Sequence, residues 1–293
     1  MPSLLPLVTM SIPEQLPADI VSCIIEQATS NEPSLSKLVQ LSHINSVFVE
    51  SCCSVVSTRV RSVIRTFMDD GVMDSLFKIL ESVHGLIGGS VALDVIEPDF
   101  FIDHPPGDID IMTPSGTMTE WVGWCDSHGF VDRETGEVNP DREDSTKSIL
   151  WVRMHNGMEL KIHQSQSSSV LLTLLSSNLM LQMNTISPFR IYCFYPWMTI
   201  NGILISCQGS PTTYDIDQLE CRLIEYYWST CLWNRPCGRG CPMIWHLSYG
   251  VGMYEWSRRA HLSYDVFAET HLQWGIGNDC YNVHCPYRVQ EID

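Results

Sequence analysis

Residues 85–96 read GLIGGSVALDVI, and residues 108–112 read DIDIM. The apolar residues before the glycine pair and the alternation in DIDIM predict two short strands, and SVALDVI between them predicts one or two helical turns. A glycine pair between a strand and a helix lets backbone N–H groups approach a phosphate, and the start of the helix adds partial positive charge. The segment therefore predicts an α+β fold in which Gly88, Gly89 and Ser90 form a phosphate-binding turn.

Two carboxylates are expected side by side on the second strand. Residues i and i+2 of a strand point to the same side, so Asp108 and Asp110 share one face while Ile109 and Ile111 enter the core. Adjacent carboxylates repel each other strongly unless a cation lies between them, and oxygen ligands suit Mg²⁺ or Mn²⁺. The DIDIM strand therefore indicates a divalent-metal site whose aspartates are candidate catalytic residues.

A third carboxylate for such a site must come from a neighbouring strand. The segments ILWVRM and MELKIH predict a strand pair, because the intervening Asn156-Gly157 favours a hairpin turn. Glu159 lies between two apolar residues and therefore faces away from them, with Lys161 on its own side. Glu159 is the best candidate for the third catalytic and metal-binding carboxylate.

The arrangement of these charges distinguishes two kinds of function. If the carboxylates of Asp108, Asp110 and Glu159 bind metal, we expect them within about 4–6 Å of one point. An ion pair from Lys161 or Arg153 that fills this point would instead favour a protein-interaction role.

The order of strand, Gly-Gly-Ser, helix and Asp-x-Asp strand resembles the signature of the DNA polymerase beta-like nucleotidyltransferase superfamily. The resemblance covers about residues 80–209, with seventeen residues between Ser90 and Asp108. Later phrases such as LQMNTIS and YCFYPWMTINGILI are similar to the nucleotidyltransferase-like proteins common in basidiomycete fungi. The resemblance implies a nucleotidyltransferase-type mixed sheet flanked by helices.

The same resemblance implies roles for individual residues. Gly89 and Ser90 would hold the triphosphate of a nucleoside triphosphate, Asp108 and Asp110 would hold metals, and Glu159 would stand at the third carboxylate position. The implied reaction is transfer of a nucleotidyl group to an acceptor hydroxyl with two Mg²⁺ ions, of which one activates the hydroxyl and the other stabilises the leaving pyrophosphate. A fold can host other functions, so an inactive relative and a non-catalytic, substrate-recruiting scaffold remain alternatives.

Residues 1–80 are predicted to be helical. In LPADIVSCIIEQAT, helical spacing places four apolar residues on one face: Leu16, Ile20, Ile24 and Ile25. The next run, SLSKLVQLSHINSVF, has Ser34 or Ser36 as its N-cap. In the third run, TRVRSVIRTFMDDGVMDSLFKIL, Gly71 is expected to break the helix and Asp74 to cap a short one that ends near Leu80.

The first two of these runs also resemble a degenerate F-box, in which Leu-Pro precedes an apolar helix and a second helix follows. The resemblance implies binding to the Skp-type adaptor of ubiquitin ligases through an exposed apolar helix face. Any short helical bundle that packs on the next domain has the same spacing, so both interpretations stay open.

The rest of the chain completes a three-part division: 1–80, a core at 81–210, and 211–293. In the core, VLLTLLSSNLMLQM predicts a helix and RIYCFYPWMTINGILISC a β-rich stretch. The last part predicts a helix over DIDQLECRLIEYYWSTCL and then a loop-rich segment, dense in Cys, His and aromatic residues, that packs on the core.

Four cysteines near the C-terminus are a candidate structural zinc site. They form two spaced pairs, Cys237-x3-Cys241 and Cys280-x4-Cys285, and four thiolates suit a tetrahedral zinc ion. The spacing differs from the usual CxxC pairs, and buried free thiols in an aromatic-rich core are the alternative.

The composition of the chain limits the binding partners and the cellular compartment that we expect. The 293 residues carry a formal net charge of -17, which repels phosphate backbones and argues against broad nucleic-acid binding. The start of the chain lacks the pattern of a secretory signal, and its least charged stretch is too polar for a membrane span. We therefore expect a cytoplasmic or nuclear protein with reduced thiols.

Overall fold

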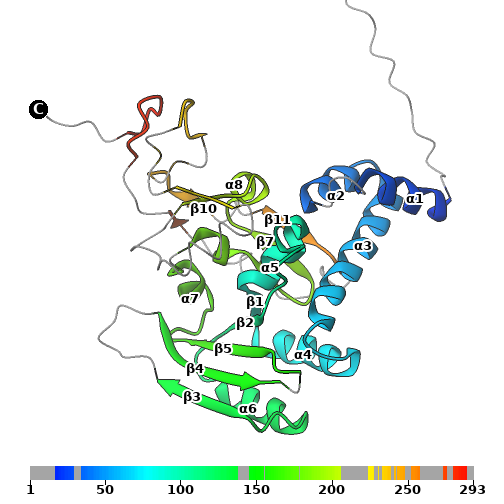
Figure 1. Ribbon diagram of the computed structural model, residues 1–293, viewed down its shortest axis with the longest axis vertical. Coiled ribbons are helices and arrows are strands. Elements are labelled where there is room, and N and C mark those ends of the chain that lie inside the picture. Colours follow the sequence, from blue (N-terminus) through cyan, green and yellow to red (C-terminus); the bar gives the residue numbers. More distant parts are fainter. Residues whose placement is uncertain are drawn as a thin grey trace, which may run out of the picture.

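A computed structural model gives the fold of the chain. The structure describes residues 17–29, 34–137, 145–154, 156–177, 179–205, 224–227, 230, 233–238, 241, 243–247, 252–257, 273–275 and 280–288. At its centre lies a mixed eight-stranded sheet with helices on both faces (Figure 1). The predicted fold class, an α+β fold with a mixed sheet flanked by helices, is confirmed.

The central sheet joins strands from distant parts of the sequence. Only β2 and β5 pair in parallel, and the other neighbours in this sheet are antiparallel. Across the sheet, the order is β11 (Gly252–Glu255), β7 (Arg190–Cys193), β6 (Thr185–Ile186), β1 (Leu86–Gly88), β2 (Asp108–Thr113), β5 (Glu159–Ser165), β4 (Thr146–Arg153) and β3 (Arg133–Glu137).

Two apolar cores cover the faces of this sheet. The larger core packs one face against α3 (Ser46–Arg65), α4 (Asp70–Val83), α5 (Gly89–Ile96) and α6 (Met118–Ser127). The smaller core lies on the other face, with α7 (Leu171–Leu175), the 3-10 turn η2 (Met180–Met183) and α8 (Pro196–Ile200).

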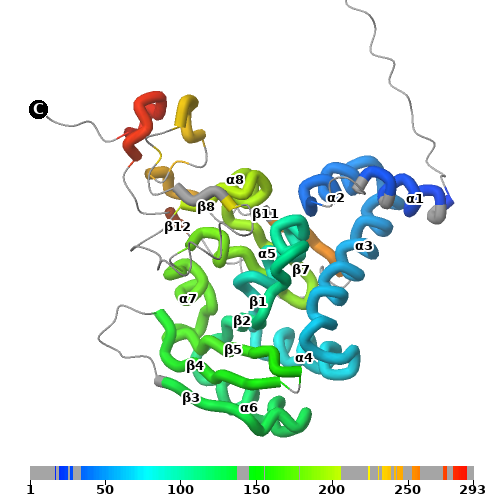
Figure 2. Tube along the Cα trace, in the orientation of Figure 1, coloured from blue at the N-terminus to red at the C-terminus, as the bar shows by residue number. Residues whose placement is uncertain are grey.

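The remaining elements lie outside the central sheet. They are α1 (Ala18–Thr29) and α2 (Leu35–Ser42), which pack on α3; the 3-10 turn η1 (Pro98–Phe101); the pair β8 (Ile203–Ile205) and β9 (Glu225–Tyr227); and the pair β10 (His246–Leu247) and β12 (Gln273–Trp274). Figure 2 shows the red C-terminal segment far from the blue helices α1 and α2.

The alternation in β2 and β5 places the polar residues. Ile109 and Ile111 of β2 are fully buried in the larger core, as is Leu160 of β5. Because strand side chains alternate, Asp108 and Asp110 must point to the opposite face, the one that also carries the smaller core. The strands predicted in DIDIM, ILWVRM and MELKIH are confirmed, as is the hairpin between β4 and β5.

The buried face of α1 differs from the prediction. Val21 and Ile25 are fully buried, whereas Ile20 and Ile24 are 45% and 40% exposed. Helix α1 therefore packs on its neighbours along a stripe rotated by one residue. Leu16 lies outside the described residues.

The start of α4 was also predicted wrongly. Asp69 caps this helix, because its carboxylate accepts a hydrogen bond of 3.0 Å from the amide of Val72. Gly71 lies inside the first turn instead of breaking the helix, and Asp74 follows one turn later. The predicted cap of the preceding helix is confirmed, since Ser34 caps α2.

Two further helix predictions fail in part. The stretch VLLTLLSSNLMLQM forms only the short helix α7 and the turn η2, because the polar Ser176-Ser177 favours a turn after α7. Within the helix predicted over 215–232, residues Glu225–Tyr227 form a strand, since they pair with β8. Most of that predicted helix lies outside the described residues. Among the described helices, none has the length and apolarity that crossing a membrane requires.

We expect Ser34→Ala to lower the free energy of unfolding by about 1–3 kcal/mol, because the hydroxyl serves two partners at once. Ser34 is buried, caps α2, and donates a hydrogen bond of 2.6 Å to the buried carboxylate of Glu97. Urea unfolding followed by circular dichroism measures the change. Ser82→Ala, on the exposed side of α4, is the control; an equal effect of both variants would contradict the role given to Ser34.

Candidate functional site

The glycine turn and the Asp-x-Asp strand meet at one point. In the β1–β2 pairing, Gly88 lies opposite Asp110. Gly89 follows in the left-handed region, with φ at +63°, and begins α5. A Cβ atom at Gly89 would stand 2.6 Å from Oδ2 of Asp110, so only glycine allows this close approach. The β1–β2 register therefore places the glycine turn in close contact with the Asp110 carboxylate.

The start of α5 offers backbone donors beside this carboxylate. The first amides of a helix have no partner inside it, and the helix dipole makes this end partly positive. Gly88 is the N-cap, and among the described residues no side chain caps this end. Ser90, in the first turn, is half-buried. These groups suit an anionic ligand such as a phosphate.

Lys161 neutralises Asp108 in this structure. Its ammonium forms an ion pair with Oδ2 of Asp108 and lies 3.8 Å from Oε2 of Glu159. Burial lowers the pKa of the ammonium, but the hydrogen bond to Asp108 and the surrounding negative charges raise it, so this pKa lies above its ordinary value. Lys161 therefore carries a positive charge at neutral pH.

His163 makes the matching contact with the second aspartate. Its Nε2 lies 3.1 Å from Oδ1 of Asp110, and both side chains are about three-quarters buried. Sequence reasoning did not select His163. The alternation in MELKIH was the available signal, because it places Glu159, Lys161 and His163 on the same face of β5.

The three predicted carboxylates come from neighbouring strands but do not surround one point. Glu159 lies opposite Asp108 in the parallel β2–β5 register. Among the described residues, however, the only set of three or more His, Cys, Asp or Glu ligands within 4.8 Å of one another is a group of cysteines. The ammonium of Lys161 lies between Asp108 and Glu159. Arg153 pairs elsewhere, with Asp132 at 3.7 Å.

The donor set therefore fits a single divalent ion better than two. Mg²⁺ commonly binds one or two protein carboxylates and completes its shell with substrate phosphates and water. Asp108 and Asp110, side by side on β2, can supply this pair. Glu159 is about half-exposed and contributes to such a site only if Lys161 moves away.

The open sheet face continues from the aspartates to a hollow of about 480 Å³. Lys161 and Glu159 form one border, and Trp151 and Arg153 of β4 lie opposite them in the β4–β5 register. The Trp151 ring is 38% exposed and lies against Gly136 of β3, where a Cβ would overlap it. The lining carries acidic and basic side chains in equal number, and the exposed aromatic ring offers a face on which a flat ligand can stack.

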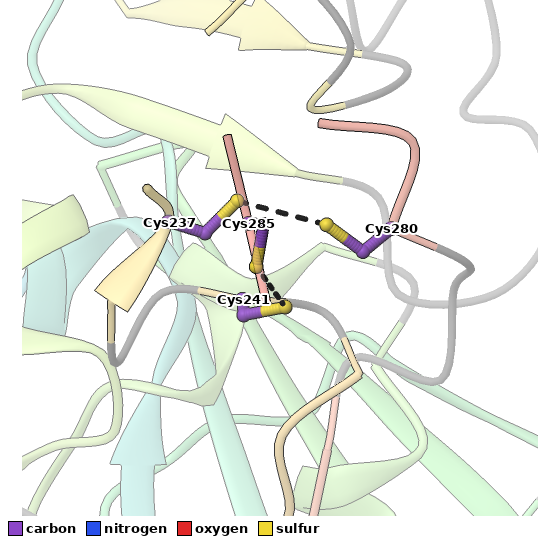
Figure 3. Close-up of side chains that lie close together, drawn as sticks. All are labelled: Cys237, Cys241, Cys280 and Cys285. Atoms are coloured by element: carbon purple, nitrogen blue, oxygen red, sulfur yellow. Dashed lines mark hydrogen bonds between the residues drawn. The ribbon is translucent and has the colours of Figure 1, made fainter. Parts of the chain in front are cut away.

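The four cysteines predicted as a metal site come together away from the sheet face (Figure 3). Their Sγ atoms all lie within 4.8 Å of one another, and all four side chains are buried: Cys237, Cys241, Cys280 and Cys285. Burial raises the pKa of the Cys237 thiol to about 12. This cluster is a candidate metal centre that is separate from the aspartates.

Comparisons with known proteins give only distant likenesses. No model of a known protein family matches the chain, and no curated protein matches it. Among solved structures, the Thermotoga maritima CCA-adding enzyme complexed with tRNA_CCA is similar, with 14% identity over 50% of this chain and a TM-score of 0.34. A complex of CCA-adding enzyme with CTP is similar too, with 13% identity over 52% of this chain and the same TM-score.

The alignments cover only a minor part of each CCA-adding enzyme chain. This chain covers 35% and 36% of the two CCA-adding enzyme chains. Likeness at this level does not assign the chain to a family.

We expect Gly89→Ala to destabilise the protein by at least about 2 kcal/mol, because it adds a Cβ in the left-handed region and against Asp110. Gly123→Ala is the matched control. Gly123 lies within α6 with open space at its Cβ position, so alanine there should raise stability by about 0.5–1 kcal/mol. Chemical unfolding of both variants measures the two values, and a neutral Gly89→Ala would disprove the close approach.

Proposed function

We propose that the chain transfers a nucleotidyl group from a nucleoside triphosphate to an acceptor hydroxyl, with release of pyrophosphate and with the help of a divalent ion, Mg²⁺ or Mn²⁺. One observation carries this proposal: the Gly88–Asp110 register sets a glycine-lined helix start against the Asp-x-Asp strand. An anion-binding end and a cation-binding pair thereby lie next to each other. A metal-bound polyphosphate has both charges and matches this arrangement.

The start of α5 is the proposed binding place of the triphosphate. Its amides and the Ser90 hydroxyl would donate to phosphate oxygens, and Gly89 keeps side-chain atoms out of their way. A local site of this kind is needed because the protein as a whole carries a formal net charge of -17. Without fixed donors and a cation, the surrounding negative field would repel the nucleotide.

Asp108 and Asp110 are the proposed metal ligands, and Glu159 is the proposed further carboxylate. A divalent ion held there would neutralise phosphate charge and activate the acceptor hydroxyl. Lys161 competes for the same carboxylates in the structure. We propose that its ammonium turns from Asp108 to a phosphate oxygen when nucleotide binds, which conserves the charge balance of the site.

His163 and Trp151 extend the proposed site on either side. The contact between His163 and Asp110 orients that carboxylate toward Gly89. The Trp151 ring forms part of the border of the hollow and offers a stacking surface for a base or for the acceptor. Both residues therefore serve in positioning.

A second candidate function is a non-catalytic scaffold that recruits substrates through an F-box-like helical segment. Two observations favour it. The ion pair of Lys161 occupies Asp108 in the manner expected of an interaction protein. In addition, Ile20 and Ile24 leave an exposed apolar stripe on α1, where a Skp-type adaptor of ubiquitin ligases would bind.

For the enzymatic proposal, we expect nucleoside triphosphates to bind the full chain only with Mg²⁺ or Mn²⁺ present. Asp110→Ala should weaken this binding at least about tenfold, as the loss of a metal contact does. Isothermal titration calorimetry with each of the four ribonucleotides measures it. Asp74→Ala, which removes an exposed carboxylate of α4, is the control. Equal nucleotide binding by wild type and by Asp108→Ala/Asp110→Ala would reject the proposed site.

For the scaffold function, we expect the purified chain to retain the adaptor in a pull-down. Ile24→Asp should abolish retention, because it places a charge in the apolar stripe of α1. Ile102→Asp is the control, since Ile102 is more exposed but lies after η1. If the wild-type chain does not retain the adaptor, the F-box-like interpretation is wrong.

A further inference from the structure

We infer that Cys237, Cys241, Cys280 and Cys285 bind one zinc ion as a closed, structural tetrathiolate site. The site joins residues 233–238 and Cys241 to residues 280–288, which lie about forty residues later in the sequence. This inference does not depend on the proposed nucleotidyl transfer.

The sulfur spacing agrees with zinc. A tetrahedral ion with Zn–S bonds of about 2.3 Å places its four sulfurs roughly 3.8 Å apart. In the structure, Cys237 Sγ lies 3.7 Å from Cys280 Sγ, and Cys285 Sγ lies 3.6 Å from Cys241 Sγ (Figure 3). Each short contact joins one cysteine from each segment, and all four sulfurs fit within 4.8 Å.

The same distances argue against two disulfides. A disulfide requires an S–S separation of about 2.05 Å, well below the separations observed. All four residues are free cysteines in the structure. The four thiols instead point toward one another, which is the arrangement that a single central metal ion requires (Figure 3).

Hydrogen-bond donors surround the sulfurs. Asn282 Nδ2 lies 3.1 Å from Cys237 Sγ and also donates to the carbonyl oxygen of Arg235 at 2.7 Å. The hydroxyl of Thr230 lies 3.4 Å from Cys280 Sγ and can donate a hydrogen bond to it. Such donors stabilise negative charge on sulfur, and they are the outer contacts that thiolate–metal sites commonly have.

The surroundings are closed to substrate. All four cysteines are at most 5% exposed, and Trp233 and Ile244 pack against them. Four protein ligands fill a tetrahedral zinc shell and leave no open position for water or substrate. The geometry therefore points to a structural ion.

The clamp also connects to the smaller core of the sheet. Trp233 packs against both the cysteines and that core. Its ring meets Trp197 of α8 edge-on at 6.1 Å, and the guanidinium of Arg235 lies 5.1 Å from the centre of the Trp197 ring. Zinc binding would thus fix the cysteine segments to one another and hold Trp233 and Arg235 against α8.

The decisive measurement is the metal content of the full chain, prepared without a histidine tag. We expect one zinc ion per chain by elemental analysis and by native mass spectrometry. Under denaturing, non-reducing conditions, the mass should correspond to free thiols. Absence of metal, iron in place of zinc, or a mass lower by four hydrogen atoms, as two disulfides would give, would each overturn the inference.

Variants then assign the ligands. Cys280→Ser/Cys285→Ser should lose the zinc, whereas Cys23→Ser, at an exposed cysteine of α1, should keep it. If the double variant does not fold, a mercurial thiol reagent on the wild-type chain replaces this test. It should release one zinc ion per chain, and Co²⁺ substitution should give the absorption of a tetrahedral thiolate site. Zinc that persists in the folded double variant, or a Co²⁺ spectrum without thiolate bands, would exclude these ligands.

Discussion

The contact between the Gly89 backbone and the Asp110 carboxylate is the constraint on which the sheet face depends. This contact follows from the burial of one face of β2 and from the register between β1 and β2. Ile109 and Ile111 must face the larger core, which turns both aspartates of β2 to the opposite face. The β1–β2 register then leaves no room for a side chain at Gly89. A one-residue slip of β2 would bury the aspartates and expose the isoleucines, so the apolar core itself holds the polar site in register.

Charge compensation explains how this face stays folded without a ligand. Two half-buried carboxylates on one strand repel each other, and Lys161 and His163 of β5 each approach one of them. Partly buried ion pairs add little net stability, but removal of one partner leaves a costly charge. In the proposed reaction, a divalent cation would take the place of Lys161 at Asp108, and the Lys161 ammonium would move to a phosphate oxygen.

The parts of the fold that could be predicted are those set by local pattern. Period-two alternation identified β2 and β5, and Asn156-Gly157 identified the hairpin between β4 and β5. The incorrect predictions concern elements whose structure is set by contacts between residues that are distant in sequence. The buried stripe of α1 is chosen by α2 and α3, and β9 is a strand because β8 lies beside it. The same holds for the predicted site. The alternation along β2 and β5 predicts which residues share a face. That Lys161 lies between Asp108 and Glu159 depends on how the two strands pair, which the sequence alone does not give.

The spacing of the cysteines allows a prediction in a segment whose sequence has no clear helical or strand periodicity. Their spacing suggested a set of four, but only the fold pairs Cys237 with Cys280 and Cys241 with Cys285. The described strands β10 and β12 of this region are each two residues long, and Trp274 of β12 is buried in the smaller core. Strands this short restrain few backbone dihedrals, so other contacts must offset the conformational entropy lost when the neighbouring segments become ordered. The inferred zinc ion would offset this loss by joining distant residues directly, and Trp233, which packs against both the cysteines and the smaller core, would link the clamp to the core.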